Sequence, residues 1–164
     1  MRKRVYIEST VVSYFVAGPS RDLIVAARQE STRDLWPKIL SRFDTYISAL
    51  VYQEAARGET EQADKRLGVI KPFTMLDVDK EAQAVAEKII AGKGIPQEHP
   101  EDALHVAVAA VNGIEILVTW NFAHLNNPLT RLMIRETVEE AGYHVRKYAR
   151  PTSFWSQRHE RPDC

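Results

Sequence analysis

The stretch Val5-Tyr6-Ile7-Glu8-Ser9-Thr10 decides the fold of this chain. Its three leading apolar residues predict a short buried strand, and Ser9 or Thr10 is a typical cap for a helix that follows at once. Glu8 stands at the junction. A lone carboxylate at the exit of a buried strand is costly, and in an open α/β sheet this edge is where ligands bind. We therefore expect Glu8 to have a partner there.

Strands and helices alternate along the rest of the sequence. The predicted strands cover residues 5–7, 45–48, 73–76, 116–119 and 144–148. The predicted helices cover residues 9–17, a longer segment that Ser20 caps and Pro37 kinks or splits, 49–57, 59–67 up to Gly68, 79–91, 101–111 and 129–141. This alternation favours an α/β fold with a parallel sheet that carries helices on both faces.

Length and charge limit the classes of protein that the chain can represent. The 164 residues fit one domain, which we place at residues 1–150, with a polar tail at 151–164 that is either disordered or partner-binding. Lysine and arginine together number 22, as do aspartate and glutamate, so the formal net charge is zero. This balance argues against a general nucleic-acid coat or a polybasic membrane binder.

The expected location is cytoplasmic. Cys164 is the single cysteine, so the sequence offers no disulfide framework. The apolar run before Glu8 is too short for a signal peptide, and no window is long enough to span a membrane.

Acidic and amide side chains fall where parallel strands end. Glu8 leaves the first strand, and Glu54 lies in the first turns of the helix after the second strand. Asp102 begins the helix before the strand at 116–119, and Asn121 follows that strand. Because right-handed crossovers place the carboxyl ends of all strands at one edge, Glu54 and Asp102 can meet Glu8. For Asp102 this depends on a strand order that the sequence does not fix.

Three carboxylates in one cleft need a compensating positive charge. Two like charges at about 4 Å repel by roughly 4 kcal/mol at an effective dielectric constant near 20. Either bound protons or a divalent cation can offset this repulsion, and oxygen-rich sites select Mg²⁺ or Mn²⁺. Such an ion activates water and neutralises a phosphodiester under attack.

Four segments of the chain together resemble the PIN-domain family, of the kind found as the toxin half of VapBC toxin–antitoxin modules. They are Val5-Tyr6-Ile7-Glu8-Ser9-Thr10, Ser48-Ala49-Leu50-Val51-Tyr52-Gln53-Glu54-Ala55-Ala56-Arg57-Gly58, Glu101-Asp102-Ala103-Leu104-His105-Val106-Ala107 and Leu117-Val118-Thr119-Trp120-Asn121-Phe122-Ala123-His124-Leu125. Each motif is weak alone, but their order and spacing make the set fairly specific.

The resemblance implies a fold, an activity and a set of site residues. The fold would be a PIN-like three-layer α/β/α sandwich, and the activity would be that of a metal-dependent endoribonuclease, a hydrolase that uses metal-activated water. Glu8, Glu54 and Asp102 would hold Mg²⁺ or Mn²⁺, and Asn121 would orient water. Thr119 and either Thr10 or Ser9 would add hydroxyl contacts. The implied partners are an RNA substrate, an antitoxin protein and a second copy of the chain in a homodimer.

Departures from the family pattern keep a second function open. The first acid is commonly aspartate and is Glu8 here, and the fourth motif commonly carries an aspartate where this chain has Asn121 and His124. Because asparagine has no charge, metal affinity would be lower. The alternative is therefore a catalytically weak or inactive PIN-like module that binds RNA or protein. A nucleotide or flavin binder ranks last, because no glycine-rich phosphate loop occurs.

Each of the three acids also has a purely structural interpretation. Glu8 could cap the helix that follows it, and Asp102 could be a first-turn acid stabilised by the helix dipole. Glu54 could pair with Arg57, three residues further along its helix. His105 lies one turn beyond Asp102 and could support it, and His124 is a weak candidate of the same kind, but a solvated surface histidine is the simpler interpretation of both.

Aromatic and basic residues raise the question of where RNA would lie. Trp120 could stack on a base, although packing in the core or at its rim is the simpler interpretation. The side chains Tyr14, Phe15 and Trp36 are predicted to make apolar contacts between helices. The basic candidates for RNA contact are Arg21, Arg57, Lys93 and Arg131, with a further group towards the C-terminus at Arg146, Lys147, Arg150, Arg158 and Arg161. For this last group the simpler interpretation is that these side chains belong to a solvated C-terminal segment.

Overall fold

A five-stranded parallel sheet forms the centre of the protein. The computed structural model describes residues 1–144 and 147–158. The strands run in the order β3-β2-β1-β4-β5, and all four neighbouring pairs are parallel. Their bounds are Lys3–Ile7 for β1, Phe43–Ser48 for β2, Thr74–Leu76 for β3, Ile116–Val118 for β4 and Lys147–Ala149 for β5.

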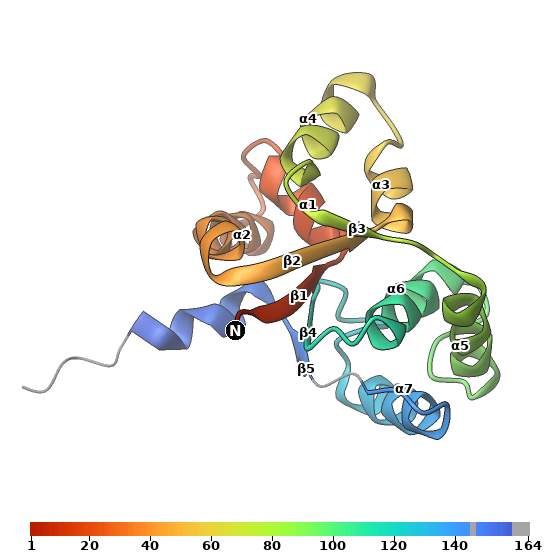
Figure 1. Cartoon of the computed structure of the whole chain (residues 1–164). Helices are drawn as coiled ribbons and strands as arrows, with labels where there is room; N and C mark the ends of the chain where they lie inside the picture. The colour runs from red at the N-terminus through yellow and green to blue at the C-terminus, as the bar shows by residue number, and fades with distance from the viewer. Residues whose placement is uncertain (145–146, 159–164) are drawn as a thin grey trace, which may run out of the picture.

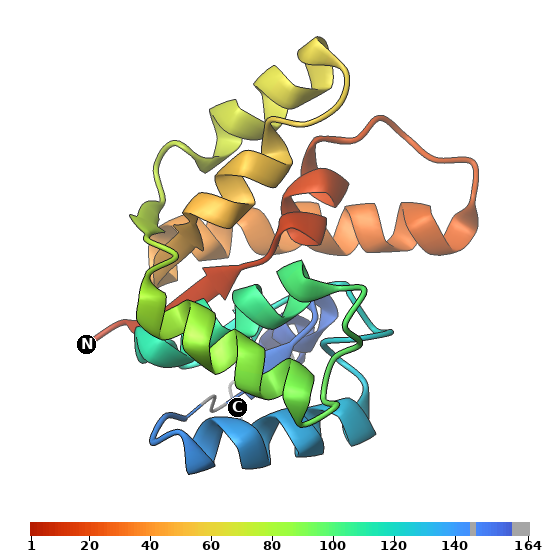
Figure 2. The same ribbon diagram turned by 90° about the vertical axis from the view of Figure 1, so that its right-hand side faces the viewer.

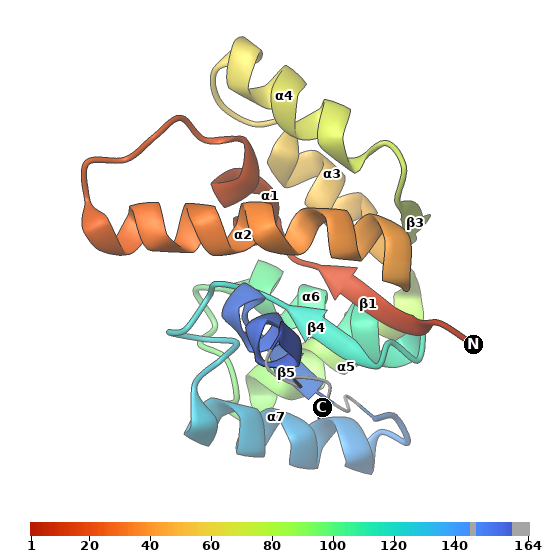
Figure 3. The same ribbon diagram turned by 90° about the vertical axis from the view of Figure 1, so that its left-hand side faces the viewer.

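Helices cover both faces of the sheet and make the fold a three-layer α/β/α sandwich, as the sequence predicts. Figure 3 shows α2 and the 3₁₀ helix η1 in front of one face, and Figure 2 shows α5 and α6 in front of the opposite face. The helical bounds are Ser9–Val16 (α1), Leu23–Arg42 (α2), Ala49–Ala55 (α3), Thr60–Ile70 (α4), Lys80–Ala91 (α5), Pro100–Val111 (α6), Pro128–Glu140 (α7) and Pro151–Arg158 (η1).

The strand order places a topological switch point between β1 and β4. From the central β1 the chain adds β2 and β3 on one side and then returns to add β4 and β5 on the other (Figure 1). Ligands bind in such sheets at the carboxyl ends of the strands beside this point. The helix α6 precedes β4 and runs back against it, so the start of α6 lies at the same carboxyl edge.

Several helix boundaries differ from the sequence prediction by one or two residues, and two further differences have clear local reasons. The helix α2 is capped by Asp22, not Ser20, because Asp22 Oδ1 accepts hydrogen bonds from the amides of Ile24 at 2.9 Å and Val25 at 3.0 Å. It also continues through Pro37 without being split. The helix α4 passes through Gly68 and ends at Ile70, whose side chain is buried. This burial outweighs the roughly 0.5–1 kcal/mol that glycine costs inside a helix.

Side chains from the sheet and from both helical layers share one core. The β1 residues Tyr6 and Ile7 and the β4 residue Leu117 are fully buried. On the α2 side, the rings of Phe15 and Trp36 stack with their centroids 3.9 Å apart, which confirms the predicted contact between helices. None of the helices in the described part of the chain has the length and apolar character needed to cross a membrane.

The segment after β5 returns to the sandwich. The helix η1 packs against α2, the ring of Phe154 meets that of Phe43 edge-on at 5.6 Å, and Lys38 Nζ donates to the Phe154 carbonyl at 3.3 Å. The predicted strand at 144–148 is observed at Lys147–Ala149. Arg146, Arg161 and Cys164 lie outside the described residues.

Replacing Leu117 by alanine tests the core. Leu117 is fully buried in β4, so Leu117→Ala should lower the free energy of unfolding by about 2–5 kcal/mol. The matched control Leu129→Ala, at a position on α7 that is 68% exposed, should change it by less than about 0.5 kcal/mol. Urea unfolding followed by circular dichroism measures both, and equal losses would contradict the described core.

Candidate active site

Glu8 is fixed at the switch point between β1 and β4. Its amide donates to the Val118 carbonyl at 3.1 Å, which extends the β1–β4 pairing by one residue. Its side chain is only 3% exposed. It caps α1, because its carboxylate accepts the amide of Thr10 at 3.1 Å. The structural interpretation of Glu8 as a helix cap is thus confirmed, and it leaves room for a second role.

The Glu8 carboxylate uses only one of its two oxygens in protein contacts. Oε2 accepts hydrogen bonds from the amide and hydroxyl of Thr10 and from the Thr119 hydroxyl at 2.8 Å. Oε1 accepts none from the residues that the structure describes. The two threonines therefore orient the carboxylate and leave one oxygen available to a ligand.

Glu54 is brought to the same edge by α3. Ser48 caps this helix by accepting the Val51 amide at 3.3 Å. Glu54 Oε1 is hydrogen-bonded to His105 Nε2 at 2.8 Å, and Oε2 has no hydrogen bond within the described ranges. The alternative interpretation of Glu54 as an ion-pair partner of Arg57 is not observed among the described residues, since the carboxylate pairs with His105 instead.

His105 corrects the prediction of a solvated surface histidine. Its side chain is 1% exposed, because α6 packs its face against the sheet. Its Nδ1 is 2.7 Å from the Tyr6 hydroxyl, which is also 2.7 Å from Ser48 Oγ. Both ring nitrogens are therefore occupied by protein contacts, and His105 orients Glu54 rather than offering a free ligand atom.

The charges in this network support one another. Burial lowers the pKa of His105, but the hydrogen bond to Glu54 and the nearby carboxylates outweigh burial and raise the pKa above its ordinary value. Burial raises the pKa of Glu54, but the hydrogen bond and the charge of His105 outweigh burial and lower it. The pair is thus stabilised in its ionised form. Burial also raises the pKa of Tyr6, which keeps its hydroxyl protonated.

Glu8 and Glu54 face one hollow of about 250 Å³. Ligand atoms of Glu8, Glu54 and His105 lie within 4.8 Å of one another. Ser9 also lines the hollow, and its buried hydroxyl is close enough to Glu54 to help lower the pKa of that carboxyl, although it makes no hydrogen bond of standard geometry to the described residues. Since His105 is already engaged, the free donors are carboxylate and hydroxyl oxygens. This chemistry fits a hard cation such as Mg²⁺ or Mn²⁺.

Asp102 belongs to a neighbouring group with two histidines. Asp102 Oδ2 is 2.8 Å from His124 Nδ1, and the His124 ring lies against that of His99 with centroids 4.2 Å apart. The side chain of His124 is 25% exposed, so it is partly buried and bonded rather than solvated. Asp102 lies one turn before His105, and its charge helps to raise the pKa of His105, so the two groups are electrostatically coupled.

Asn121 shapes the turn after β4. Its Oδ1 accepts the amide of His124 at 3.0 Å, and its own amide donates to Thr119 Oγ1 at 2.9 Å. The side-chain nitrogen Nδ2 makes no hydrogen bond to the described residues. The structure therefore brings Glu8 and Glu54 together, and it places Asp102 and Asn121 on the same edge within the adjoining histidine cluster.

Sequence reasoning missed several residues that build the site. Tyr6, Ser48 and His99 were not singled out. Tyr6 carried a usable signal, since a tyrosine inside a buried strand needs a partner for its hydroxyl. Trp120 is 5% exposed, which confirms packing in the core.

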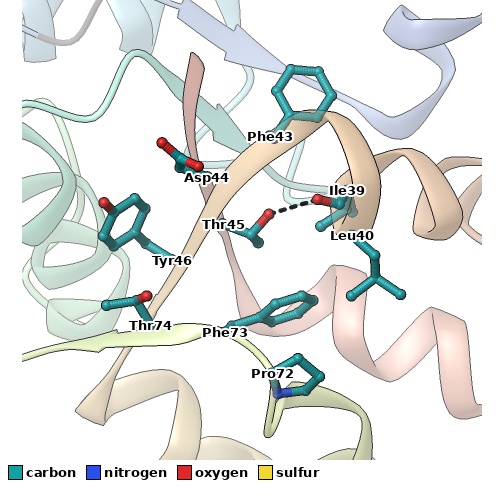
Figure 4. A pocket seen from close by; sticks show the side chains of 9 residues that line it. All are labelled: Ile39, Leu40, Phe43, Asp44, Thr45, Tyr46, Pro72, Phe73 and Thr74. Carbon is teal, nitrogen blue, oxygen red and sulfur yellow. Dashed lines mark hydrogen bonds between the residues drawn. The ribbon is translucent and has the colours of Figure 1, made fainter. Parts of the chain in front are cut away.

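A further hollow lies at the other end of the sheet. It measures about 310 Å³ and is lined by the first residues of β2, the end of α2 and the segment that enters β3. Figure 4 shows Asp44 as the one carboxylate among its labelled side chains, and the Thr45 hydroxyl bonds the Ile39 carbonyl at 2.9 Å. The paired carboxylates are thus a property of the carboxyl edge.

A parallel α/β/α sandwich with acidic residues at the switch point defines a class of fold with a ligand site at the carboxyl edge. The PIN domain family model matches residues 5–123. The chain belongs to the PIN domain family, whose members are generally nucleases that use divalent metals.

The comparison with solved structures agrees with the fold. The protein is similar to a chain of VapBC2 from Rickettsia felis, solved bound to a DNA fragment from their promoter, with a TM-score of 0.55 and 14% identity over 76% of this chain and 93% of that chain. At this identity the likeness establishes the fold alone. A search of proteins with curated functions finds no match.

The His105–Glu54 pair predicts a pH-dependent stability. The raised pKa of His105 stabilises the fold below its ordinary value of 6.5, and this stabilisation is lost as pH rises through the folded pKa. The lowered pKa of Glu54 stabilises the fold above its ordinary value of 4.5. With EDTA present, Glu54→Gln should therefore lower the free energy of unfolding most between pH 4.5 and pH 6.5, by about 1.5–3 kcal/mol. Above pH 8 the loss should be smaller.

Urea unfolding at pH 5.5 and pH 8.5 measures this difference. The control Glu61→Gln removes an exposed pair with Lys65 at 3.1 Å and should cost below about 1 kcal/mol at both values. If Glu54→Gln lowered the free energy of unfolding equally at both pH values, the ionised pair would be ruled out.

Proposed function

We propose that the protein is a divalent-metal-dependent endoribonuclease and the toxin of a toxin–antitoxin pair. The observation that carries the proposal is the pair Glu8 and Glu54, which converge on one hollow with an unbonded oxygen each. Two carboxylates that converge on one hollow repel each other, and a cation bound by their free oxygens offsets this repulsion. Membership of the PIN domain family supports nuclease chemistry at this site.

The residues that would hold the metal are Glu8, Glu54 and Asp102. Asp102 has its Oδ1 without a hydrogen bond in the described residues and lies at the start of α6, at the same edge. The open oxygens of these side chains suit Mg²⁺ or Mn²⁺. When bound, such an ion supplies an activated water and neutralises the charge of a phosphodiester.

Other side chains would hold these ligands in place. Thr10 and Thr119 fix one oxygen of Glu8, and His105 fixes one oxygen of Glu54. His124 does the same for Asp102. Such outer contacts raise metal affinity by limiting the motion of the ligands. Asn121 Nδ2 is the group that would orient a water molecule.

The biological setting is also a proposal. The VapBC2 structure is that of a toxin–antitoxin complex, and its similarity in fold supports an antitoxin as a partner of this protein. The RNA substrate and the homodimer follow from the family resemblance, and the cytoplasmic location follows from the lack of a disulfide framework in the sequence. We also propose residues 1–150 as the PIN-like domain and residues 151–164 as a C-terminal tail, for which partner binding is one of the two predicted roles; its segment Pro151–Arg158 packs against α2.

Replacement of one acid tests the nuclease. Purified protein should cleave single-stranded RNA with Mn²⁺ or Mg²⁺ and stop when EDTA is added. Asp102→Asn should slow cleavage by more than about 100-fold. Replacing even a residue that only orients a metal ligand lowers metal affinity or activity by about 10–100-fold. The matched control Asp44→Asn, in the hollow at the opposite end of the sheet, should cleave at the wild-type rate. Equal cleavage by Asp102→Asn would show a contaminating nuclease.

A non-catalytic binding module is the second candidate. It is favoured by Asn121, which supplies no charge and spends its side-chain oxygen on the His124 amide. Calorimetric titration with Mn²⁺ separates the two functions. If the protein is a nuclease, it should bind Mn²⁺, and Glu8→Gln should lower its affinity for Mn²⁺ by at least about 10-fold. RNA binding without any Mn²⁺ binding at millimolar concentration would favour the module.

A further inference from the structure

A positively charged hollow of about 280 Å³ lies at the carboxyl ends of β4 and β5. It is lined by Phe122, Asn126, Arg131, Tyr148, Arg150 and Ser153. These residues come from the turn after β4, the first turns of α7, and β5 with the residues that follow it. The lining therefore contains two guanidinium groups and no carboxylate.

This hollow adjoins the acidic one along the same edge. Arg150 directly follows Ala149, whose carbonyl accepts the amide of Thr119 at 2.9 Å. The hydroxyl of Thr119 in turn binds Glu8. The end of β5 that carries Arg150 is therefore linked through Thr119 to Glu8 at the end of β1.

The charges of the two arginines are not neutralised by an acidic side chain, and an aromatic ring also holds Arg150 in place. Neither Arg131 nor Arg150 takes part in an ion pair within the described part of the chain. The Arg150 guanidinium lies 5.9 Å from the centre of the Phe122 ring, and Arg28 lies 5.0 Å from the same ring. Stacking on an aromatic face orients a guanidinium while its N–H groups stay available to an anion.

Tyr148 adds a donor that lacks an acceptor. Its hydroxyl is buried and has no hydrogen-bond partner among the described residues. Burial raises the pKa of Tyr148, although Arg131 and Arg135 oppose this shift, so the hydroxyl keeps its proton. A buried polar group without a partner is uncommon in proteins and calls for an explanation such as a ligand.

A row of aromatic rings connects the two hollows. Tyr14 lines the acidic hollow, and its ring lies 5.8 Å from that of Trp120. Trp120 in turn lies 6.0 Å from Phe122, which lines the arginine hollow. Arg28 bridges the row, with its guanidinium 5.5 Å from the Trp120 ring and its Nη1 3.3 Å from the Tyr14 hydroxyl.

From these observations we infer that the arginine hollow binds a backbone phosphate of single-stranded RNA, next to the phosphodiester that a metal ion at Glu8 and Glu54 would contact. This assignment rests on the proposed function, because it makes the hollow a subsite of the same nuclease. Guanidinium groups suit phosphate through paired N–H donors. Single strands are commonly bound by basic grooves with interleaved aromatic side chains. Here Tyr14 and Phe122 would have that role, because Trp120 is buried in the core between them. This places Arg131 and Arg150 in the RNA path and gives Arg21, Arg57 and Lys93 no part in this subsite.

Binding in EDTA tests the subsite without cleavage. Fluorescence anisotropy of a labelled single-stranded RNA oligonucleotide should show affinity about 10-fold lower for Arg131→Ala and for Arg150→Ala, the loss expected for one charged hydrogen bond. Each variant should also reduce the slope of log affinity against log salt by about 0.7. The control Arg135→Ala removes a guanidinium already paired with Glu139 at 3.4 Å on the same helix, and it should stay within about 2-fold of wild type.

Tyr148→Phe separates binding from folding. The hydroxyl has no partner in the described protein, so its removal should leave the unfolding midpoint unchanged or raised. RNA affinity should fall by about 5-fold, as for one neutral hydrogen bond. A variant that unfolds more readily and binds RNA as well as wild type would assign the hydroxyl a structural role instead and overturn this part of the subsite.

The remaining outcomes separate this inference from the nuclease assignment. RNA binding that depends on both arginines in EDTA supports the subsite even if no RNA is cleaved with Mn²⁺, a result that would overturn only the nuclease. Wild-type protein that binds no RNA, or an Arg131→Ala/Arg150→Ala double variant with unchanged affinity, overturns the subsite. Inorganic phosphate that binds wild type but not the double variant, with RNA affinity independent of the arginines, would assign the hollow to free phosphate instead.

Discussion

The arrangement of the whole site depends on one constraint, the fixing of the Glu8 carboxylate where β1 and β4 separate. The amide of Glu8 continues the pairing of the two strands, and its Oε2 is held by hydroxyls that come from both of them, Thr10 after β1 and Thr119 after β4. A carboxylate that is 3% exposed is tolerated here because these donors replace water. The same donors leave Oε1 as the oxygen that faces the hollow.

A second network places Glu54 opposite Glu8. The Tyr6 hydroxyl sits between Ser48 and His105, and His105 holds Glu54. These side chains come from β1, the end of β2, α3 and α6, so the network joins the sheet to the helices that deliver the ligands. Because every polar atom of His105 is satisfied, the network is rigid as well as stable. The network requires a buried histidine, whose charge depends on the neighbouring carboxylate of Glu54.

The carboxyl edge therefore carries opposite charges side by side. The acidic hollow at β1 and β2 attracts a cation, and the arginine hollow at β4 and β5 attracts an anion. The rings of Tyr14, Trp120 and Phe122 lie between them. A neutral protein can thus hold a polyanion locally, which the overall charge balance neither predicts nor excludes.

The sequence by itself determined the α/β class and the positions of the acids at strand ends, because both follow from local patterns of apolar and capping residues. The four PIN-like motifs could also be recognised without coordinates. Local patterns gave the wrong helix boundary at two places. The helix α4 continues through Gly68, because Ile70 is buried, and Asp22 caps α2 in place of Ser20.

Only the tertiary structure decided which side chains meet. The strand order set β4 beside β1, and this brought Thr119 to Glu8 across 111 positions of the chain. It also buried His105 against Glu54, paired Asp102 with His124, and gathered Arg131 and Arg150 around one hollow. Such contacts join residues far apart in the chain, and their geometry depends on how whole strands and helices pack, which no local pattern of residues encodes.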